Sequence, residues 1–217
     1  MSESERQSDP AGPGTPEPQT PVRRTPLQER SRDTVQRILE AASLLLATMP
    51  LAKITTNLIA RQAQLSIGAL YRFFPDKQAI IDALAARHLD DLEVVLTQRL
   101  TGTNAEDGPA LLSRVIDDYL LFMDARPDFR AIARNWQESG AAGCNETPPD
   151  RGGTAVLKRF LTERMHMEDT PNLELRLRIA NQVGELLIFY AYEQSSADRP
   201  KVIGELKRLL SGYLFGV

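Results

Sequence analysis

The sequence predicts an all-α protein of about nine helices. Apolar residues recur every three or four positions along most of the chain, and proline or glycine separates one such pattern from the next. No stretch of useful length alternates apolar and polar residues in the manner of a half-buried strand. The 217 residues, of which 42% are hydrophobic, suffice for one or two small packed domains.

The N-terminal residues 1–30 differ in composition from the rest. They contain six prolines and almost no large apolar side chain, so folding would bury too little surface to offset the ordering entropy. We expect a disordered tail here, followed by two helical domains at residues 31–77 and 78–217. Arg23 and Arg24 near the end of the tail can reach into a DNA minor groove, although a solvated tail is the simpler interpretation.

The next part of the chain holds four helical patterns, each with a recognisable start or stop. Pro50 ends the first pattern, and Pro75 breaks the chain before the fourth. Thr56 and Ser66 have side chains that are preferred at helix N-caps, and they precede the second and third patterns. The predicted helices cover residues 31–49, 56–63, 67–74 and 77–102.

Five more helical patterns follow. The fifth helix is marked by apolar residues from Leu112 to Met123, and Pro127 begins the sixth, where the first turn of a helix tolerates proline. Residues 139–153 are rich in glycine and proline, which predicts a loop. The remaining helices are predicted at residues 154–166, 171–195 and 198–215.

Charge is distributed unevenly along the chain. The net charge of −3 is the sum of −3 over residues 1–22, +5 over residues 23–77 and −5 over residues 78–217. A basic segment attracts the phosphates of a nucleic acid, and an acidic remainder is repelled by them. The charge pattern therefore favours a nucleic-acid contact within residues 23–77.

Residues 55–77 have the layout of a helix-turn-helix, which places its second helix in the major groove of DNA. A helix that reads bases needs a small and open N-terminal end, which residues 67–69 provide. Gly68 is unfavourable inside a helix and needs a reason: close approach to DNA is one, and a close crossing of two helices is the other. Side chains able to contact phosphates or a thymine methyl follow at Tyr71, Arg72 and Lys77.

Three stretches of this segment and of the helix before it resemble the tetracycline-repressor (TetR-type) family of bacterial regulators: residues 37–42, 55–60 and 66–77. The resemblance implies a homodimer on a palindromic DNA site and a ligand-responsive helical domain. The side chains that it implies on phosphates are Thr56, Tyr71, Arg72 and Lys77. Those implied on bases are Asn57, Ile67, Gly68 and Tyr71, with Ser66 part of the same site at the cap of the reading helix.

The turn of this motif departs from the family. The family usually has glycine where this chain has Gln64. A residue at this place is expected to adopt a positive φ, which is strained for glutamine. We therefore expect a slightly altered turn within an otherwise matching motif.

The predicted helix at residues 171–195 is apolar over most of its circumference. Its polar residues fall on a single narrow stripe, formed by Glu174, Arg178, Asn181 and Glu185. Such a helix must be buried on more than one side. Together with the last helix and the same two helices of a second copy, it can form a four-helix dimer interface; burial inside one subunit is the alternative.

Aromatic side chains of the second domain can line an effector pocket. The candidates are Tyr119, Phe122, Trp136, Phe160, Phe189 and Tyr190, with Asn181 and Glu185 to orient a ligand. A plain core and a solvated polar stripe are the alternative interpretations of these sets. His88 is expected to be a core histidine with its hydrogen bond satisfied. His166 and Cys144 do not form a metal site with it, and we expect neither a metal nor a cofactor.

These features predict a ligand-responsive transcriptional regulator, expected to be a repressor that a small molecule releases from DNA. A DNA-binding structural or protein-interaction factor without an effector is the alternative. An enzyme is not expected, because the sequence lacks a phosphate-binding glycine loop, metal-ligand spacing and any nucleophile–base arrangement, and so offers no catalytic residue. A polar start, a single cysteine and no long apolar run predict a cytoplasmic, nucleoid-associated protein without a membrane span.

Overall fold

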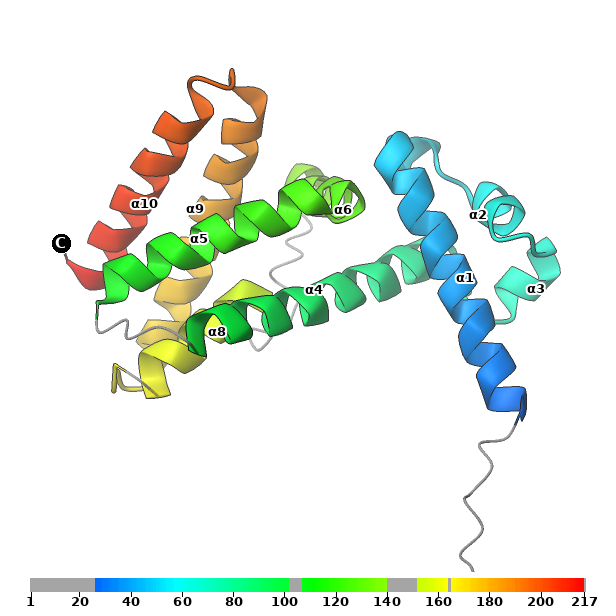
Figure 1. Ribbon diagram of the computed structural model, residues 1–217, viewed down its shortest axis with the longest axis horizontal. Coiled ribbons are helices and arrows are strands. Elements are labelled where there is room, and N and C mark those ends of the chain that lie inside the picture. The colour runs from blue at the N-terminus through cyan, green and yellow to red at the C-terminus, as the bar shows by residue number, and fades with distance from the viewer. Residues whose placement is uncertain (1–25, 102–106, 140–151, 164, 217) are drawn as a thin grey trace, which may run out of the picture.

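Figure 1 shows the computed structural model, which describes residues 26–101, 107–139, 152–163 and 165–216. Within these ranges the chain forms nine α-helices and one 3₁₀ helix and no strand, which confirms the all-α prediction. They are α1 (Pro26–Thr48), η1 (Leu51–Lys53), α2 (Thr56–Gln62), α3 (Ile67–Tyr71), α4 (Lys77–Thr101), α5 (Gly108–Ala125), α6 (Pro127–Ser139), α8 (Gly152–Glu163), α9 (Pro171–Glu193) and α10 (Arg199–Phe215). None of these helices is long and apolar enough to cross a membrane.

Two hydrophobic cores divide the helices into two lobes (Figure 1). The head (residues 26–85) contains α1, η1, α2, α3 and the beginning of α4, and the body (residues 86–216) contains the rest. Ile80, Ile81 and Leu84 of α4 are buried in the core of the head. The proposed domain boundary after residue 77 thus falls at the start of a helix that runs from one lobe into the other.

Helix α1 begins at Pro26, five residues before the predicted start at Ser31. Proline suits the first position of a helix, because its missing N–H would have no partner within the helix there. Residues 26–30, which the sequence predicts to be part of the tail, belong to α1. Residues 1–25, and with them the arginine pair near the end of the expected tail, lie outside the described residues.

Helix α2 is capped by Thr55 rather than by Thr56. Thr55 has extended backbone angles, with φ −126° and ψ 157°, and its hydroxyl accepts a hydrogen bond from the Leu58 amide at 3.2 Å. These properties define an N-cap residue. Thr56 is the first residue inside the helix, so its hydroxyl is left to pair with Tyr71 of α3.

Helix α3 has the predicted cap but is shorter than predicted. Ser66 Oγ accepts a hydrogen bond from the Ala69 amide at 3.2 Å, which confirms Ser66 as the N-cap. The helix ends at Tyr71, three residues early, and the chain then turns with two amides donating to the Leu70 carbonyl. Pro75 contributes to this early end, because proline disfavours helical angles in the residue before it.

The turn between α2 and α3 uses the left-handed conformation expected of it, since Gln64 has a φ of 56°. Arg37 of α1 holds the turn: its Nη2 donates to the carbonyls of Ala63 at 2.5 Å and of Gln64 at 3.2 Å. Glutamine is strained in this conformation, whereas glycine is not. A contact from another helix therefore stabilises a turn that its own sequence does not favour.

We expect Gln64→Gly to raise the free energy of unfolding by about 1 kcal/mol, because glycine removes the strain of a positive φ. This corresponds to a melting temperature higher by about 2–4 °C for a chain of this size. Gln62→Gly is the matched control, because Gln62 is the exposed last residue of α2, where glycine lowers the free energy of unfolding by up to about 1 kcal/mol. Melting temperatures that shift in the same direction in both variants would contradict the assigned turn.

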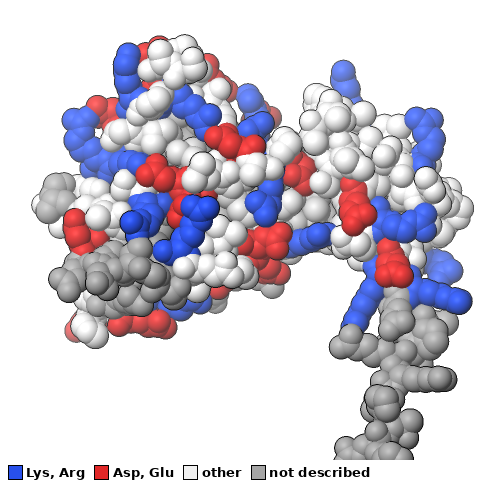
Figure 2. All heavy atoms as spheres, viewed as in Figure 1, with Lys and Arg blue, Asp and Glu red and all other residues white. Residues whose placement is uncertain are grey.

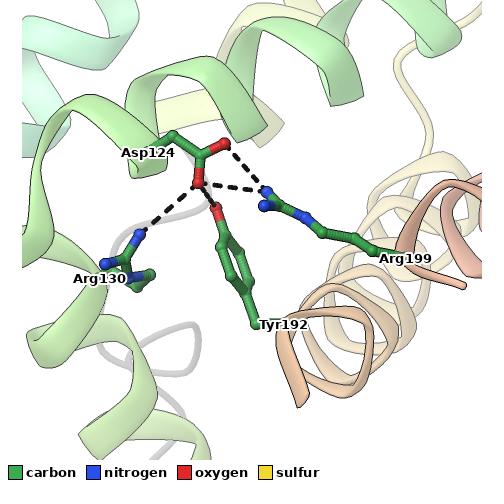
Figure 3. Close-up of polar contacts among 4 residues, drawn as sticks. All are labelled: Asp124, Arg130, Tyr192 and Arg199. Carbon is green, nitrogen blue, oxygen red and sulfur yellow. Dashed lines mark hydrogen bonds and ion pairs between the residues drawn. The ribbon is translucent and has the colours of Figure 1, made fainter. Parts of the chain in front are cut away.

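A polar cluster centred on Asp124 fixes the hairpin of α9 and α10 to α5 and α6 (Figure 3). The Tyr192 hydroxyl donates to Asp124 at 2.7 Å, and Arg199 contacts both carboxylate oxygens at 3.0 and 3.2 Å. Arg130 lies 3.6 Å from the same carboxylate. Burial and the Asp124 carboxylate raise the pKa of Tyr192 to about 12, so its hydroxyl stays protonated and remains a donor.

Candidate nucleic-acid interface

Helix α3 presents a largely exposed surface at the outer edge of the head (Figure 1). Leu70 is fully buried and anchors the helix in the core of the head, together with Phe74 just after the helix. By contrast, Tyr71 is 50% exposed and Ile67 is 37% exposed. Two large side chains one helical turn apart are thus left open to a partner.

Gly68 lies between them, and the fold gives no reason for a glycine there. A Cβ built on Gly68 would meet no atom within 4 Å among the described residues. A close crossing of two helices therefore does not explain it. Since glycine weakens a helix relative to alanine, the reason for Gly68 is expected in a surface outside the chain.

Hydroxyl groups of α2 and α3 meet at the same surface. Thr56 Oγ1 and Tyr71 Oη lie 3.1 Å apart and share a hydrogen bond. Asn57, the second residue of α2, and Arg72, which directly follows α3, are exposed. The Arg72 guanidinium lies 5.7 Å from the centroid of the Phe73 ring. The structure thus brings Thr56 and Tyr71 together and leaves Asn57 and Arg72 accessible.

Lys77 has a partner within the chain. Its Nζ donates to the Leu51 carbonyl at 3.2 Å, so the side chain ties the start of α4 to η1. Asp76 caps the same helix, because its carboxylate accepts a hydrogen bond from the Ala79 amide at 2.8 Å. The lysine and the helix N-terminus predicted to bind a phosphate together therefore each have a hydrogen-bond partner within the protein. An ammonium group has three donors, so Lys77 retains donors for a phosphate.

Within the part of the chain that the structure describes, no lysine or arginine of the head forms an ion pair with a carboxylate. Every such pair among the described residues lies in the body. Figure 2 shows lysine and arginine side chains gathered on the head where α1 begins. The exposed cations of the head include Arg30, Arg32, Lys53, Arg61 and Arg72. Cations without a carboxylate partner attract a phosphate backbone and make its binding dependent on salt.

The aromatic residues predicted to line an effector pocket do not share one environment. Buried in the core of the body are Phe122, Phe160 and Phe189. Half-buried at its edge are Tyr119 and Trp136. Tyr190 is exposed and lies outside this core, because it falls on the same side of α9 as the exposed Leu186. Its role in a pocket, like that of the other five aromatic residues, stays a prediction.

The polar pair of α9 lies against α8. The Thr154 hydroxyl donates to Asn181 Oδ1 at 3.0 Å, and Asn181 Nδ2 donates to Glu185 Oε1 at 3.4 Å. Both residues are half-buried, so they do not form a simple solvated stripe. Their role toward a ligand stays a prediction.

His88 is buried as expected, but only one of its ring nitrogens has a partner. Nε2 lies 2.7 Å from Asp128 Oδ2, whereas Nδ1 is buried with no hydrogen-bond partner among the described residues. The Ser43 hydroxyl of α1 donates to the same Asp128 oxygen at 2.6 Å. Asp128 lies in the first turn of α6 and is 5% exposed. This cluster joins the head to the body.

The sequence reasoning missed Asp128, because its partners lie 40 and 85 residues away. The one signal available was an acidic residue directly after Pro127, in the first turn of a predicted helix. Burial raises the pKa of Asp128, but the hydrogen bonds from His88 and Ser43 outweigh burial and lower this pKa to about 2. The carboxyl group is therefore ionised at neutral pH.

We expect Asp128→Asn to lower the free energy of unfolding at pH 7 by about 2 kcal/mol, which corresponds to a pKa lowered from 3.8 to about 2. A lowered pKa stabilises the fold above the pKa of the unfolded chain, and this contribution is lost as the pH falls through the pKa of the folded protein. The difference from the wild type should thus shrink between about pH 4 and pH 2. Urea unfolding at several pH values measures the difference in the free energy of unfolding between the variant and the wild type. A difference that stays constant across this window would contradict the assigned pKa.

A short exposed helix that follows a capped helix and a tight turn on a basic head defines a helix-turn-helix DNA-binding protein with a helical body. Two family models match the chain: "Bacterial regulatory proteins, tetR family" at residues 38–84 and "Tetracyclin repressor-like, C-terminal domain" at residues 109–214. The chain belongs to the TetR family of bacterial transcriptional regulators.

Solved structures of this family have similar folds. A TetR-family transcriptional regulator from Streptomyces coelicolor is 27% identical, with a TM-score of 0.65, over 85% of this chain and 99% of that chain. A TetR transcriptional regulator from Rhodococcus sp. RHA1 is 20% identical, with a TM-score of 0.62, over 87% of this chain and 99% of that chain. One from Haemophilus influenzae RD is 14% identical, with a TM-score of 0.51, over 83% and 97% respectively. A comparison with curated proteins found no match.

Proposed function

We propose that this protein is a transcriptional repressor that binds a palindromic operator as a homodimer and leaves it when a small molecule binds the body. The observation that carries the proposal is the open surface of α3, where Gly68 meets no described atom within 4 Å and Tyr71 is half exposed. A surface of this kind on a basic head suits the major groove of DNA. An operator on the chromosome would place the protein in the cytoplasm, at the nucleoid.

The exposed groups of the head divide into two proposed roles. Contacts to phosphate fix the register of the head on the duplex, and contacts to base edges select the sequence. The residues proposed to bind phosphates are Thr56, Tyr71, Arg72 and Lys77. Those proposed to face bases are Asn57, Ile67, Gly68 and Tyr71, while Ser66 holds the beginning of α3 in place.

The homodimer is supported by an apolar surface on α9 and α10, which lie side by side (Figure 1). Its exposed side chains are Leu175, Ile179, Leu186 and Tyr190 on α9 and Leu209 and Tyr213 on α10. Those of α9 recur at helical spacing, so they fall along one face. A second copy carries the same surface, and pairing the two across a twofold axis would bury both in a four-helix interface. Such a dimer presents two α3 helices to the two half-sites of a palindrome.

An effector is proposed to act through the body. A ligand that prefers the body conformation unsuited to DNA lowers the DNA affinity by its differential affinity for the two states. One observation favours the alternative of a DNA-binding factor without an effector: Phe122, Phe160 and Phe189 are packed into the core. Thermal unfolding across a panel of small molecules distinguishes the two, because a ligand stabilises only a protein that binds it.

Selection of duplexes from a random DNA pool tests the proposed function. We expect the wild-type protein to enrich an inverted repeat. We also expect transcription from a promoter that carries this repeat to fall when the protein is added. Enrichment of no sequence, or of a site without twofold symmetry, contradicts the proposal. The selected duplex then serves as the operator in binding measurements.

A further inference from the structure

Asp128 closes a contact among three helices that belong to both lobes. Its Oδ2 receives the Ser43 hydroxyl from the head and lies 2.7 Å from His88 Nε2, on the helix that connects the lobes. We infer that Asp128 is a positioning residue: its carboxylate holds the head against the body in the orientation that fits DNA, although it touches no DNA itself. The cluster of Asp128, Ser43 and His88 is called the latch below. The inference rests on the proposed function and names a part of its regulation.

The hydrogen bonds of the buried Asp128 carboxylate favour the arrangement in which α1 lies against α6. A buried carboxylate that loses its donors is strongly unfavourable, so the contact does not yield gradually. When α1 moves away from α6, the Ser43 hydroxyl is lost, and the donors left are His88 and the Phe129 amide of α6 itself. The orientation of the head is therefore expected to be either latched or released.

Helix α6 lies between the two cores. Ile132 is fully buried in the core of the head, and Phe129 is buried in the core of the body. Asp128 directly precedes Phe129 within the first turn of the same helix. A shift of α6 therefore moves the latch and both cores together, because packed interiors deform little.

His88 connects the latch to the aromatic side chains of the body. Its ring centroid lies 5.4 Å from that of Phe129 and 6.5 Å from that of Phe122, and Tyr119 packs on Phe129 at 6.4 Å. The imidazole has one polar partner, because Nδ1 has none among the described residues. A rearrangement of these rings, such as an effector would cause, changes the position of His88 and weakens its contact with Asp128.

The first measurement is the distance between head and body within one chain. Spin labels are attached at Gln62→Cys in the head and Glu163→Cys in the body, both exposed, in a Cys144→Ser background. Labelled chains are diluted into unlabelled protein, so that only the pair within a chain contributes. Double electron–electron resonance is expected to give a narrow distance distribution for this parent protein and a broad one for Asp128→Asn.

Asp118→Asn is the matched control. Asp118 is 6% exposed and pairs with Arg99 at 2.6 Å, so it is, like Asp128, a buried carboxylate with a nitrogen partner. Both members of this pair belong to the body, and the control should therefore keep the narrow distribution. Ser43→Ala keeps the charge of Asp128 but removes one of its hydrogen-bond donors, so it should broaden the distance distribution in part. Ser43→Thr supplies a hydroxyl again and should restore the narrow distribution.

The second measurement is the affinity for the selected duplex. If the DNA-competent orientation falls to about a tenth of the molecules, the apparent Kd of Asp128→Asn rises about tenfold. The apparent Kd of the Asp118→Asn control should stay within about twofold of the wild-type value, since neither Asp118 nor Arg99 is a partner of Asp128, Ser43 or His88. The affinity of Ser43→Ala is expected to lie between these two.

The outcomes separate the latch from the function on which it rests. A narrow distribution in both Asp128→Asn and Ser43→Ala, or equal broadening in Asp118→Asn, overturns the latch even if DNA binding is normal. Should Asp128→Asn fail to fold, the Ser43→Ala and Ser43→Thr pair decides the question alone. Failure of the random pool to yield any duplex overturns the proposed function, while the distance measurement still decides whether Asp128 fixes the head.

Discussion

Leu186→Glu is expected to convert the protein from a dimer into a monomer and to lower its affinity for the selected duplex by about a hundredfold or more. Leu186 is 54% exposed on the apolar side of α9, at the middle of the surface proposed to pair with a second copy. A glutamate there would meet its own counterpart or apolar side chains across the twofold axis and would lose its hydration. A monomer has only one α3 helix, so it cannot bind both half-sites at once. The additional affinity that a dimer gains from two linked α3 helices is therefore lost.

Leu121→Glu is the control for this change. Leu121 is 56% exposed but lies on α5, outside the proposed interface, so the same substitution there should leave the dimer and its affinity unchanged. Sedimentation at micromolar concentration and binding to the selected duplex measure both quantities. A Leu186→Glu protein that sediments as the wild type does would show that α9 does not form the interface.

Gly68→Ala is expected to weaken binding to the selected duplex by about tenfold to a hundredfold, which is the scale of one or two lost base contacts. The same change should leave the free energy of unfolding equal or raise it by up to about 1 kcal/mol, because alanine favours a helix and its methyl group has room. Stability and DNA affinity thus move in opposite directions. A variant defective only in folding cannot give this combination.

Gly153→Ala provides the matched control. Gly153 is likewise the second residue of its helix, α8, and an added Cβ would make an ordinary contact of 3.6 Å with Leu96. The Gly153→Ala variant should have a higher free energy of unfolding than the wild type and an unchanged affinity for the selected duplex. Equal affinities of the Gly68→Ala variant and the wild type would show that α3 does not approach DNA at this point.

The helices and the turn could be predicted because their signals are local. Apolar spacing gave the helices, and Ser66 was recognisable as a cap from its side chain. The strain at Gln64 was foreseeable because one family position requires a positive φ, and the structure confirms a φ of 56°. Thr55 and Thr56 show the limit of such signals. Two neighbouring threonines are equally good caps by composition, and only the backbone angles decide between them.

The parts of the site that were not predicted depend on contacts between distant residues. The sequence places Asp128 at the start of a helix but does not show Ser43, 85 residues earlier, lying against it. In the same way, Lys77 was expected on a phosphate, and its bond to Leu51 became visible only in the folded chain. Tyr190 is a pocket candidate because it is aromatic, and only the folded chain shows that its side chain is half exposed.

Cleavage of DNA by a reagent attached to α3 tests most directly whether this helix lies against base pairs in a symmetric complex. An iron chelate is tethered at Ile67→Cys in a Cys144→Ser protein, and a second protein carries it at Glu163→Cys on the body. We predict that the label at position 67 cuts the selected duplex at two places related by the symmetry of the inverted repeat, and that the label at position 163 does not cut. Cutting from position 163 with none from position 67 would contradict the assignment of α3 as the reading helix.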